Sequence, residues 1–292
     1  TGKTYPGAFV RETVTVPEGV TTFRVTTANE VGSSPENKVK VYVGNDEPTQ
    51  VKDVNLAIAP ETGVAKLTWS PVTTGINGGY IGNITYNVVR YPDSTTVATG
   101  LAATESTETF SAEEPLQTYS YGVAAVNDTQ TGVAGISNKS VFGAAIVPPY
   151  SEPLDNEGAL ELYTIIDNNE DGSTWEFNEK EGAASYKYSR VNDGDDWLIT
   201  PAIQLKGGKL YSVSFETCGY GYTYHERIEV KYGNQPTVAG MTHQLLDSTD
   251  IMSPNYTKFT REIAADTDQK DYVGFHAISP ADEFRLYLKN VE

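Results

Sequence analysis

An acidic loop contains the residues whose possible chemistry is easiest to recognise. The segment 167–175 reads Asp-Asn-Asn-Glu-Asp-Gly-Ser-Thr-Trp, which places oxygen-bearing side chains at alternate positions ahead of a glycine. Calcium is bound by carboxylate and amide oxygens, and a glycine permits the sharp turn that aims them at one point. We therefore expect calcium as a cofactor, with Asp167, Asn169 and Asp171 among its ligands. The alternative is an Asx turn without metal.

This loop is not an EF-hand. The twelfth position would have to be a bidentate Glu and is Asn178, and no helical period flanks the loop. We expect strands on both sides and, if calcium binds, a dissociation constant on the order of 10⁻⁴ to 10⁻³ M, as in extracellular modules.

A second acidic segment, 192–196, reads Asn-Asp-Gly-Asp-Asp and runs directly into the apolar stretch that begins at Trp197. We expect Asp195 to complete the calcium site. Asp196, beside Trp197, is expected to make a structural hydrogen bond, and for Asp193 a solvated turn is the better interpretation.

Three tyrosines alternate with small residues at Tyr220, Tyr222 and Tyr224. In an extended segment their rings would lie on one face, where flat rings cover the apolar face of a sugar at little cost in entropy. They are the candidate ligand-binding residues. The alternative is that the rings pack against the edge of a neighbouring sheet.

The sequence contains no motif that assembles a reactive group. The run from His225 to Glu229 resembles a zinc-protease motif, but Glu229 replaces the second His, and on a strand the two positions lie about 13 Å apart. Nucleophile motifs are absent, so we expect no catalytic residues and no enzyme. A glycosidase that uses two carboxylates is not excluded by motif, because only geometry decides whether two of the 39 acids flank a cleft.

Charge and composition narrow the partners. Asp plus Glu outnumber Lys plus Arg by 39 to 21, and a formal charge of −18 repels nucleic acid and anionic lipid. No apolar run is long enough for a membrane helix, so we expect no membrane insertion by this segment. The single Cys218 allows no disulfide within the chain.

Alternation of apolar and polar residues predicts strands throughout and very little helix. Clear examples are Lys38–Val43, Leu210–Phe215 and Arg227–Tyr232, each with one apolar and one polar face. Two similar strands, Phe23–Asn29 and Tyr121–Asn127, end in Asn residues 98 positions apart. That period is about one immunoglobulin-like sandwich, and prolines near 48 and 148 are typical of linkers.

Residues 48–148 resemble a fibronectin type III domain. Trp69, Tyr86 and Tyr119 match the core tryptophan, the strand C tyrosine and the tyrosine corner of that family. Residues 1–47 resemble only the last strands of such a domain. A half sandwich would leave an open edge, so we expect the native protein to continue upstream of Thr1.

Residues 149–292 resemble the jelly roll of the cleaved-adhesin or choice-of-anchor J family, which is related to MAM domains. The resemblance rests on the 167–175 loop, on the run Asp195–Ile203, on strands 209–216 and 226–230, and on the closing strands 272–276 and 284–291. It implies an all-β fold, in which fibronectin-like β-sandwiches lead into a jelly-roll β-sandwich. It also implies an extracellular location on the outer surface of a Gram-negative bacterium, with calcium held in acidic loops.

These observations favour a non-catalytic adhesion or ligand-binding module of a bacterial cell surface. Its partner would be a glycan or an extracellular protein of the host or matrix. Two alternatives remain open, an accessory region of a larger secreted hydrolase and a purely structural spacer. The sequence identifies neither the ligand nor the anchor.

Overall fold

The computed structural model describes residue 5 and residues 7–292. Within them, the helical segments are two short 3-10 helices, η1 (Glu157–Leu162) and η2 (Val238–Gly240), and none is long and apolar enough to cross a membrane. The expected all-β class is confirmed. The residues cluster into two compact units, one with the described residues up to 56 plus 66–107 and 120–138, the other with 57–65, 108–119 and 139–292.

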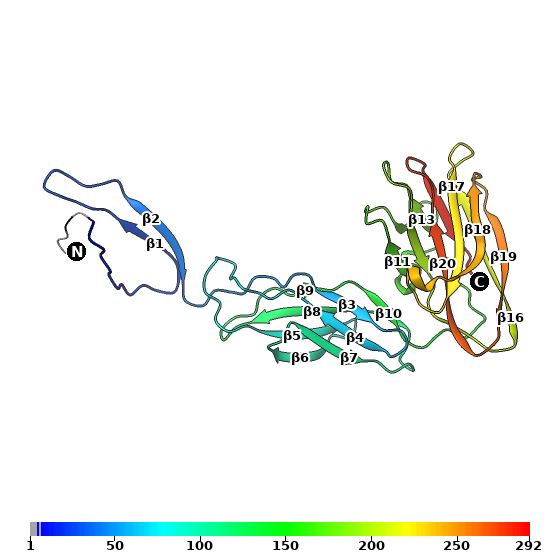
Figure 1. The fold of residues 1–292 in the computed structure, drawn as a ribbon, viewed down its shortest axis with the longest axis horizontal. Helices are drawn as coiled ribbons and strands as arrows, with labels where there is room; N and C mark the ends of the chain where they lie inside the picture. The colour runs from blue at the N-terminus through cyan, green and yellow to red at the C-terminus, as the bar shows by residue number, and fades with distance from the viewer. Residues whose placement is uncertain (1–4, 6) are drawn as a thin grey trace. The chain divides into compact units, whose positions relative to one another are not determined.

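The strands before residue 143 form three sheets (Figure 1). One is a hairpin of β1 and β2, the second has the order β10-β8-β5-β6 with β9 on β8, and the third has the order β3-β4-β7. Their bounds are β1 Gly19–Val25, β2 Asn37–Val43, β3 Asn55–Ile58, β4 Val64–Thr68, β5 Thr85–Tyr91, β6 Thr95–Leu101, β7 Glu105–Thr109, β8 Gln117–Val126, β9 Gly135–Ile136 and β10 Ser140–Phe142. Domain limits near 47 and 148 stay a prediction.

The aromatic residues expected in the sandwich core are buried. Trp69 is 5% exposed and lies edge-on to Tyr86, with the ring centroids 5.3 Å apart. The Tyr86 hydroxyl accepts a hydrogen bond from the backbone N–H of Val72 at 2.9 Å. Tyr119 is also buried, and its hydroxyl accepts from Gln117. These rings supply buried apolar area at the core positions that the family resemblance gave them.

The Tyr86 hydroxyl gives a testable contribution to stability. Replacing Tyr86 with Phe keeps the ring but leaves the buried N–H of Val72 without this acceptor. We expect a loss of about 1–2 kcal/mol of unfolding free energy in urea. Tyr80→Phe is the matched control, because Tyr80 is 72% exposed and should show no change. Equal effects of the two substitutions would contradict this account.

The first predicted strand is displaced toward the N-terminus. β1 ends at Val25, whereas the pattern predicted a strand from Phe23 to Asn29. The reason is local: the Asn29 side chain accepts hydrogen bonds from the N–H groups of Val31 and Gly32, so Asn29 belongs to a turn and cannot continue the ladder. β2 covers the predicted Lys38–Val43 strand.

The strands after residue 163 form a jelly roll of two sheets (Figure 1). One has the order β11-β14-β20-β17-β18 with β15 on β20, and the other has the order β12-β13-β21-β16-β19. Their bounds are β11 Thr164–Asp167, β12 Trp175–Asn178, β13 Ala183–Lys187, β14 Asp196–Ile199, β15 Ile203–Leu205, β16 Lys209–Gly219, β17 Glu226–Gly233, β18 His243–Ile251, β19 Thr257–Ala265, β20 Gln269–Ala277 and β21 Arg285–Lys289.

One apolar core lies between these two sheets. Phe275 of β20 meets Phe215 of β16 edge-on at 5.1 Å, and Phe215 stacks on Phe259 of β19 at 5.5 Å. Ile228 and Leu286 join the same cluster with no exposed surface. The alternation predicted for β16 and β17 therefore aims their apolar faces into this core, which fixes where the loops between strands emerge.

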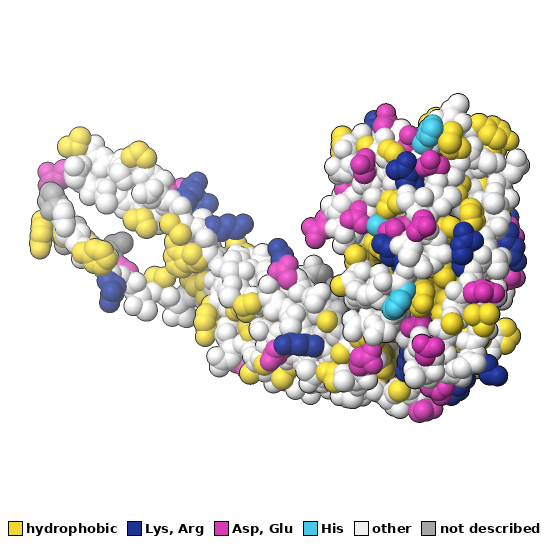
Figure 2. All heavy atoms as spheres, turned by 45° about the vertical axis from the view of Figure 1, so that its right-hand side comes forward, with side chains coloured by type: hydrophobic (Ala, Val, Ile, Leu, Met, Phe, Trp, Pro, Cys, Tyr) yellow, Lys and Arg dark blue, Asp and Glu magenta, His cyan; other side chains and the backbone are white. Residues whose placement is uncertain are grey.

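Four loops emerge together at one end of the jelly roll. They are residues 168–174 between β11 and β12, 188–195 between β13 and β14, 220–225 between β16 and β17, and 278–284 between β20 and β21, and we call this region the loop end. Figure 2 shows Asp and Glu side chains dispersed over the visible face of the C-terminal sheets, with Lys and Arg among them. The two acidic loops and the tyrosine segment of the sequence all lie in the loop end.

Candidate functional site

Hydrogen bonds between loops hold the loop end together. The Asn169 side chain donates to the carbonyl of Asp193 at 2.9 Å, and the Asp193 carboxylate accepts from the N–H of Ala281 at 2.9 Å. The N–H of Gly194 donates to the carbonyl of Ser279, and that of His225 to the Glu283 carboxylate. All four loops are therefore cross-linked, and side chains on them are held in defined positions.

The first acidic loop is closed by its own carboxylates. Asp167 accepts from the N–H groups of Asp171 at 3.2 Å and Gly172 at 2.8 Å, and Asn169 also accepts from Asp171. Asp171 accepts from Ser173 at 2.8 Å and from the Asn192 side chain at 3.2 Å. Although burial opposes it, these bonds lower the pKa of Asp171. The structure thus brings Asp167, Asn169 and Asp171 together as predicted, in the hydrogen bonding of an Asx turn.

Asp196 is the unusual carboxylate of this region. It lies opposite Asp167 in the β11–β14 register and has no exposed surface. Its Oδ2 accepts from the N–H of Asp195 at 3.2 Å, whereas its buried Oδ1 has no hydrogen-bond partner. Burial, together with the charges of Asp167 and Asp171, raises the pKa of Asp196 to about 7. The sequence predicted a structural hydrogen bond for Asp196, and the bond from the N–H of Asp195 accounts for one of its two carboxylate oxygens.

The oxygen atoms of these residues are chemically suited to a hard cation, but they are not arranged as a complete coordination sphere. The Thr174 hydroxyl lies near enough to Asp196 to lower its pKa, although neither that hydroxyl nor the Oδ1 of Asp196 makes a hydrogen bond of normal geometry. The Asp196 carboxylate is an oxygen donor of the kind calcium prefers, and a cation would relieve the repulsion among three carboxylates. Across residues 5 and 7–292, however, no three His, Cys, Asp or Glu side chains already converge as a metal site. A bound ion would therefore require Asp167 to exchange loop N–H groups for the metal.

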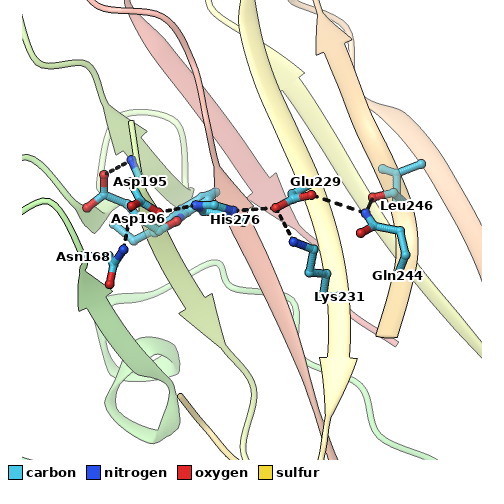
Figure 3. A network of polar contacts seen from close by, with 9 residues as sticks. Asn168, Asp195, Asp196, Glu229, Lys231, Gln244, Leu246 and His276 are labelled. Carbon is cyan, nitrogen blue, oxygen red and sulfur yellow. Dashed lines mark hydrogen bonds and ion pairs between the residues drawn. The ribbon is translucent and has the colours of Figure 1, made fainter. Parts of the chain in front are cut away.

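Asp195, the fourth predicted ligand, belongs to a different network (Figure 3). Its Oδ1 contacts Nε2 of His276 at 2.7 Å, and its Oδ2 accepts from the Asn168 side chain at 2.6 Å. The other ring nitrogen of His276 contacts Glu229 at 2.8 Å, and Glu229 also pairs with Lys231 at 2.8 Å. Both Asp195 oxygens are thus engaged across the face of the sheet.

This network places a histidine between two carboxylates, on the ring of Trp197, whose centroid lies 4.0 Å from that of His276. Burial opposes ionisation of Asp195 and Glu229, but hydrogen bonds from Asn168, Lys231 and His276 lower the pKa of both carboxyl groups. Both ring nitrogens of His276 therefore face carboxylate oxygens, and neither is left open toward a substrate.

The tyrosine segment does not form the extended row expected from its sequence. Residues 220–225 contain bends and no strand. Tyr220 and Tyr224 both turn onto Phe284, with ring centroids 4.2 and 5.3 Å away, whereas the Tyr222 hydroxyl accepts from the Asn255 side chain at 3.3 Å. Tyr220 is 51% and Tyr222 67% exposed. The structure therefore joins Tyr220 and Tyr224 and sets Tyr222 apart.

Two further rings belong to this group, and neither was identified from the sequence. Tyr188 stacks on Phe284 at 5.9 Å, so Tyr188, Tyr220, Tyr224 and Phe284 form what we call the aromatic cluster. Phe284 is the common contact of the other three. The only sequence signal was that Phe284 begins a predicted closing strand, which does not indicate a surface role.

A buried carboxylate positions the centre of the aromatic cluster. Glu226 has no exposed surface; its Oε1 accepts from the N–H of Phe284 and its Oε2 from the hydroxyl of Ser279, both at 2.7 Å. Burial raises the pKa of Glu226 against these two bonds. Both oxygens accept from the 278–284 loop, so Glu226 fixes the backbone of this loop at Phe284.

Comparisons with known proteins assign this chain to no family. No family model matches the chain, and no curated protein matches it. A cleaved adhesin domain of Lys-gingipain from Porphyromonas gingivalis is 20% identical, with 49% of this chain and 95% of that chain covered at a TM-score of 0.39. A second such domain of the same protein is 19% identical, with coverages of 49% and 96% and a TM-score of 0.40.

A CBM22 xylan-binding domain from Paenibacillus barcinonensis is 8% identical, with 49% of this chain and 90% of that chain covered at a TM-score of 0.33. The fold and the site described above therefore rest on the geometry of this chain itself.

Proposed function

We propose that this protein is a non-catalytic binding module of a bacterial cell surface, and that its loop end binds a glycan. The observation that carries the proposal is the aromatic cluster, in which Tyr220 is half exposed while its ring is held on Phe284. A flat ring fixed before binding covers the apolar face of a sugar without a large loss of entropy.

Polar side chains that could form hydrogen bonds with sugar hydroxyl groups lie around the aromatic cluster. Glu283, whose carboxylate accepts from the N–H of His225, belongs to the same loop as Phe284, and Asn255 donates to the exposed Tyr222. A glycan offers both hydroxyl donors and apolar ring faces, which this combination of carboxylate, amide and tyrosine suits. Tyr222 would then contact the outer part of the ligand, beside Tyr220 and Tyr224.

The hydrogen bonds of the buried Glu226 and of His276 support the proposal that the module is not catalytic. Both oxygens of Glu226 accept from the 278–284 loop, and both ring nitrogens of His276 face carboxylates. General acid or base catalysis needs a group free to exchange a proton with a substrate. These groups instead fix loops and strands, as expected of a rigid binding scaffold.

Calcium is the proposed cofactor of the same end of the jelly roll. Asp167, Asn169 and Asp171 would hold it as the sequence suggested, with Asp196 in place of Asp195, because Asp196 has the orphaned buried oxygen while Asp195 is engaged by His276 and Asn168. The ion would neutralise the carboxylates and brace the loops that carry Tyr188 and Phe284. We also propose that the protein lies outside the cell, on the surface of a Gram-negative bacterium. Residues 48–148 would then serve as a spacer domain.

A glycan array tests the function. The wild-type chain should bind a discrete set of glycans, and Tyr220→Ala should lower its affinity for them on the order of tenfold, because a sugar face loses its stacking partner. Tyr220→Phe keeps the ring and should retain binding. Tyr80→Ala, a 72% exposed tyrosine outside the jelly roll, is the matched control. Equal binding by Tyr220→Ala and wild type would refute the site.

A further inference from the structure

A cavity opens between the two sheets of the jelly roll at the end opposite the loop end. Its volume is about 230 Å³, and its walls come from β15, β16, β19 and β20, from Val291 and from the segment 148–150. β16 enters this end at Lys209 and reaches the loop end at Gly219, and β20 runs the same way from Gln269 to Ala277. The cavity is therefore separated from the aromatic cluster by the length of the sandwich.

The walls of the cavity are mainly apolar core residues. Leu205, Ile263, Val273 and Val291 belong to the buried cluster between the sheets, and Val213 packs against it. Protein cores are close-packed, and an apolar cavity of about 150 Å³ is already large enough to take up benzene. A cavity of this size therefore has room for one six-membered ring or a short alkyl chain.

Two tyrosines at the cavity offer their rings rather than their hydroxyls. The Tyr150 hydroxyl is hydrogen-bonded to that of Tyr163 at 2.9 Å, and the Tyr211 hydroxyl accepts from the N–H of Lys206 at 2.8 Å. Because both hydroxyl groups are already satisfied, the surface that these side chains add to the walls is aromatic. This favours an occupant with an apolar body.

The charged side chains that line the cavity are all acidic. Asp271 lines it, is only 5% exposed, and has one oxygen that accepts from the Gln269 side chain at 2.6 Å. Glu292 also lines it, with its carboxylate paired to Lys258 at 3.0 Å. The lining residues include no Lys, Arg or His. A buried carboxylate at an apolar cavity, in a chain of charge −18, favours a cationic head group over an anionic one.

We infer that this cavity binds a small primary amine carried on an aromatic ring or short alkyl chain. The apolar body lies among Leu205, Val213 and Ile263, and the ammonium group donates to the carboxylate of Asp271. The site is independent of the glycan site at the loop end, so either can be present without the other.

Titration of the full chain with three probes that share a phenylethyl group tests the inference. The probes are 2-phenylethylamine, 2-phenylethanol and 3-phenylpropionate, and binding is followed by chemical-shift changes in NMR spectra. The amine should bind saturably, with the carboxylate weaker by at least about tenfold, because a charge-assisted hydrogen bond is replaced by repulsion. Equal binding of amine and carboxylate, or no saturable binding of the amine, would overturn the inference.

Variants locate the binding. Asp271→Asn should weaken the amine about tenfold and leave the alcohol unchanged, since only the charge is removed. Val213→Phe should fill the cavity and abolish binding of all three probes, while Val191→Ala, at an 82% exposed position of the loop end, should leave their binding unchanged. Amine binding that survives Val213→Phe in a folded chain would contradict the location. The comparison of probes on the wild-type chain needs no variant and decides the chemistry if Val213→Phe does not fold.

Discussion

Without calcium, the jelly roll is expected to lose about 4 kcal/mol of stability between pH 4 and pH 8 through Asp196 alone. The pKa of this carboxyl is about 7 in the folded chain against an ordinary value of 3.8. A raised pKa means that the stabilising contribution is fully present below pH 3.8 and is lost as the pH rises through 7, where a buried charge must form. The sign is opposite to that for Asp195 and Glu229, whose pKa values are lowered.

The measurement is the unfolding free energy in urea of the wild-type chain minus that of Asp196→Asn, at each pH and in the presence of chelator. Trp69→Phe in both chains leaves Trp175 and Trp197 of the jelly roll as the fluorescent reporters. The difference should fall by about 4 kcal/mol from pH 4 to pH 8. Saturating calcium should abolish this fall, because the metal binds the ionised carboxylate. A constant difference would contradict the raised pKa of Asp196, and a fall that calcium leaves unchanged would support the Asx turn without metal.

Replacing Glu226 with Ala is expected to destabilise the jelly roll by about 3 kcal/mol and to weaken glycan binding as well. The substitution removes the acceptor of both the Phe284 N–H and the Ser279 hydroxyl in a site with no exposed surface. Buried donors that lose their acceptor cost the full desolvation of each group. Phe284 would also lose its fixed position beneath Tyr220 and Tyr224, so the loop end should lose affinity even where the chain remains folded.

Glu226→Gln separates these effects. The amide keeps one oxygen for the N–H of Phe284, and the Ser279 hydroxyl can rotate to accept from the new NH₂ group, so the loss should stay near 1 kcal/mol. Glycan affinity should then remain close to that of the wild-type chain. Loss of affinity in a fully stable Glu226→Gln variant would assign Glu226 a direct contact with the ligand, contrary to the positioning role.

Local patterns predicted the parts of the fold that depend on neighbouring residues. Alternation identified Lys38–Val43 within β2, Leu210–Phe215 within β16 and Arg227–Tyr232 within β17, because a half-buried strand imposes a period of two on its own side chains. Buried aromatics such as Trp69 followed from the same logic. The displacement of β1 arose where a side-chain turn at Asn29 competed with the ladder.

The site was harder to predict because distant segments build it. His276 meets Asp195 across 81 positions and Glu229 across 47, a network that no local spacing shows. Glu226, which the sequence indicated only as part of a rejected zinc motif and as the first residue of the strand 226–230, is tied to Phe284 by a contact across 58 positions. Residues 220–225 contain bends instead of an extended row, and Tyr220 and Tyr224 pack on Phe284 next to β21, as the alternative interpretation of these tyrosines had it. Their role in ligand binding stays a prediction.

Ring-carbon NMR signals of the full chain, recorded while an array-selected glycan is added, test the central claim most directly. Binding at the loop end predicts saturable shifts for the rings of Tyr220, Tyr222, Tyr224 and Phe284, because a sugar face lies against them. Tyr80 and Tyr86 should not move. Shifts confined to rings outside the loop end, or none at saturating glycan, would contradict the proposal that this end of the jelly roll is the binding surface.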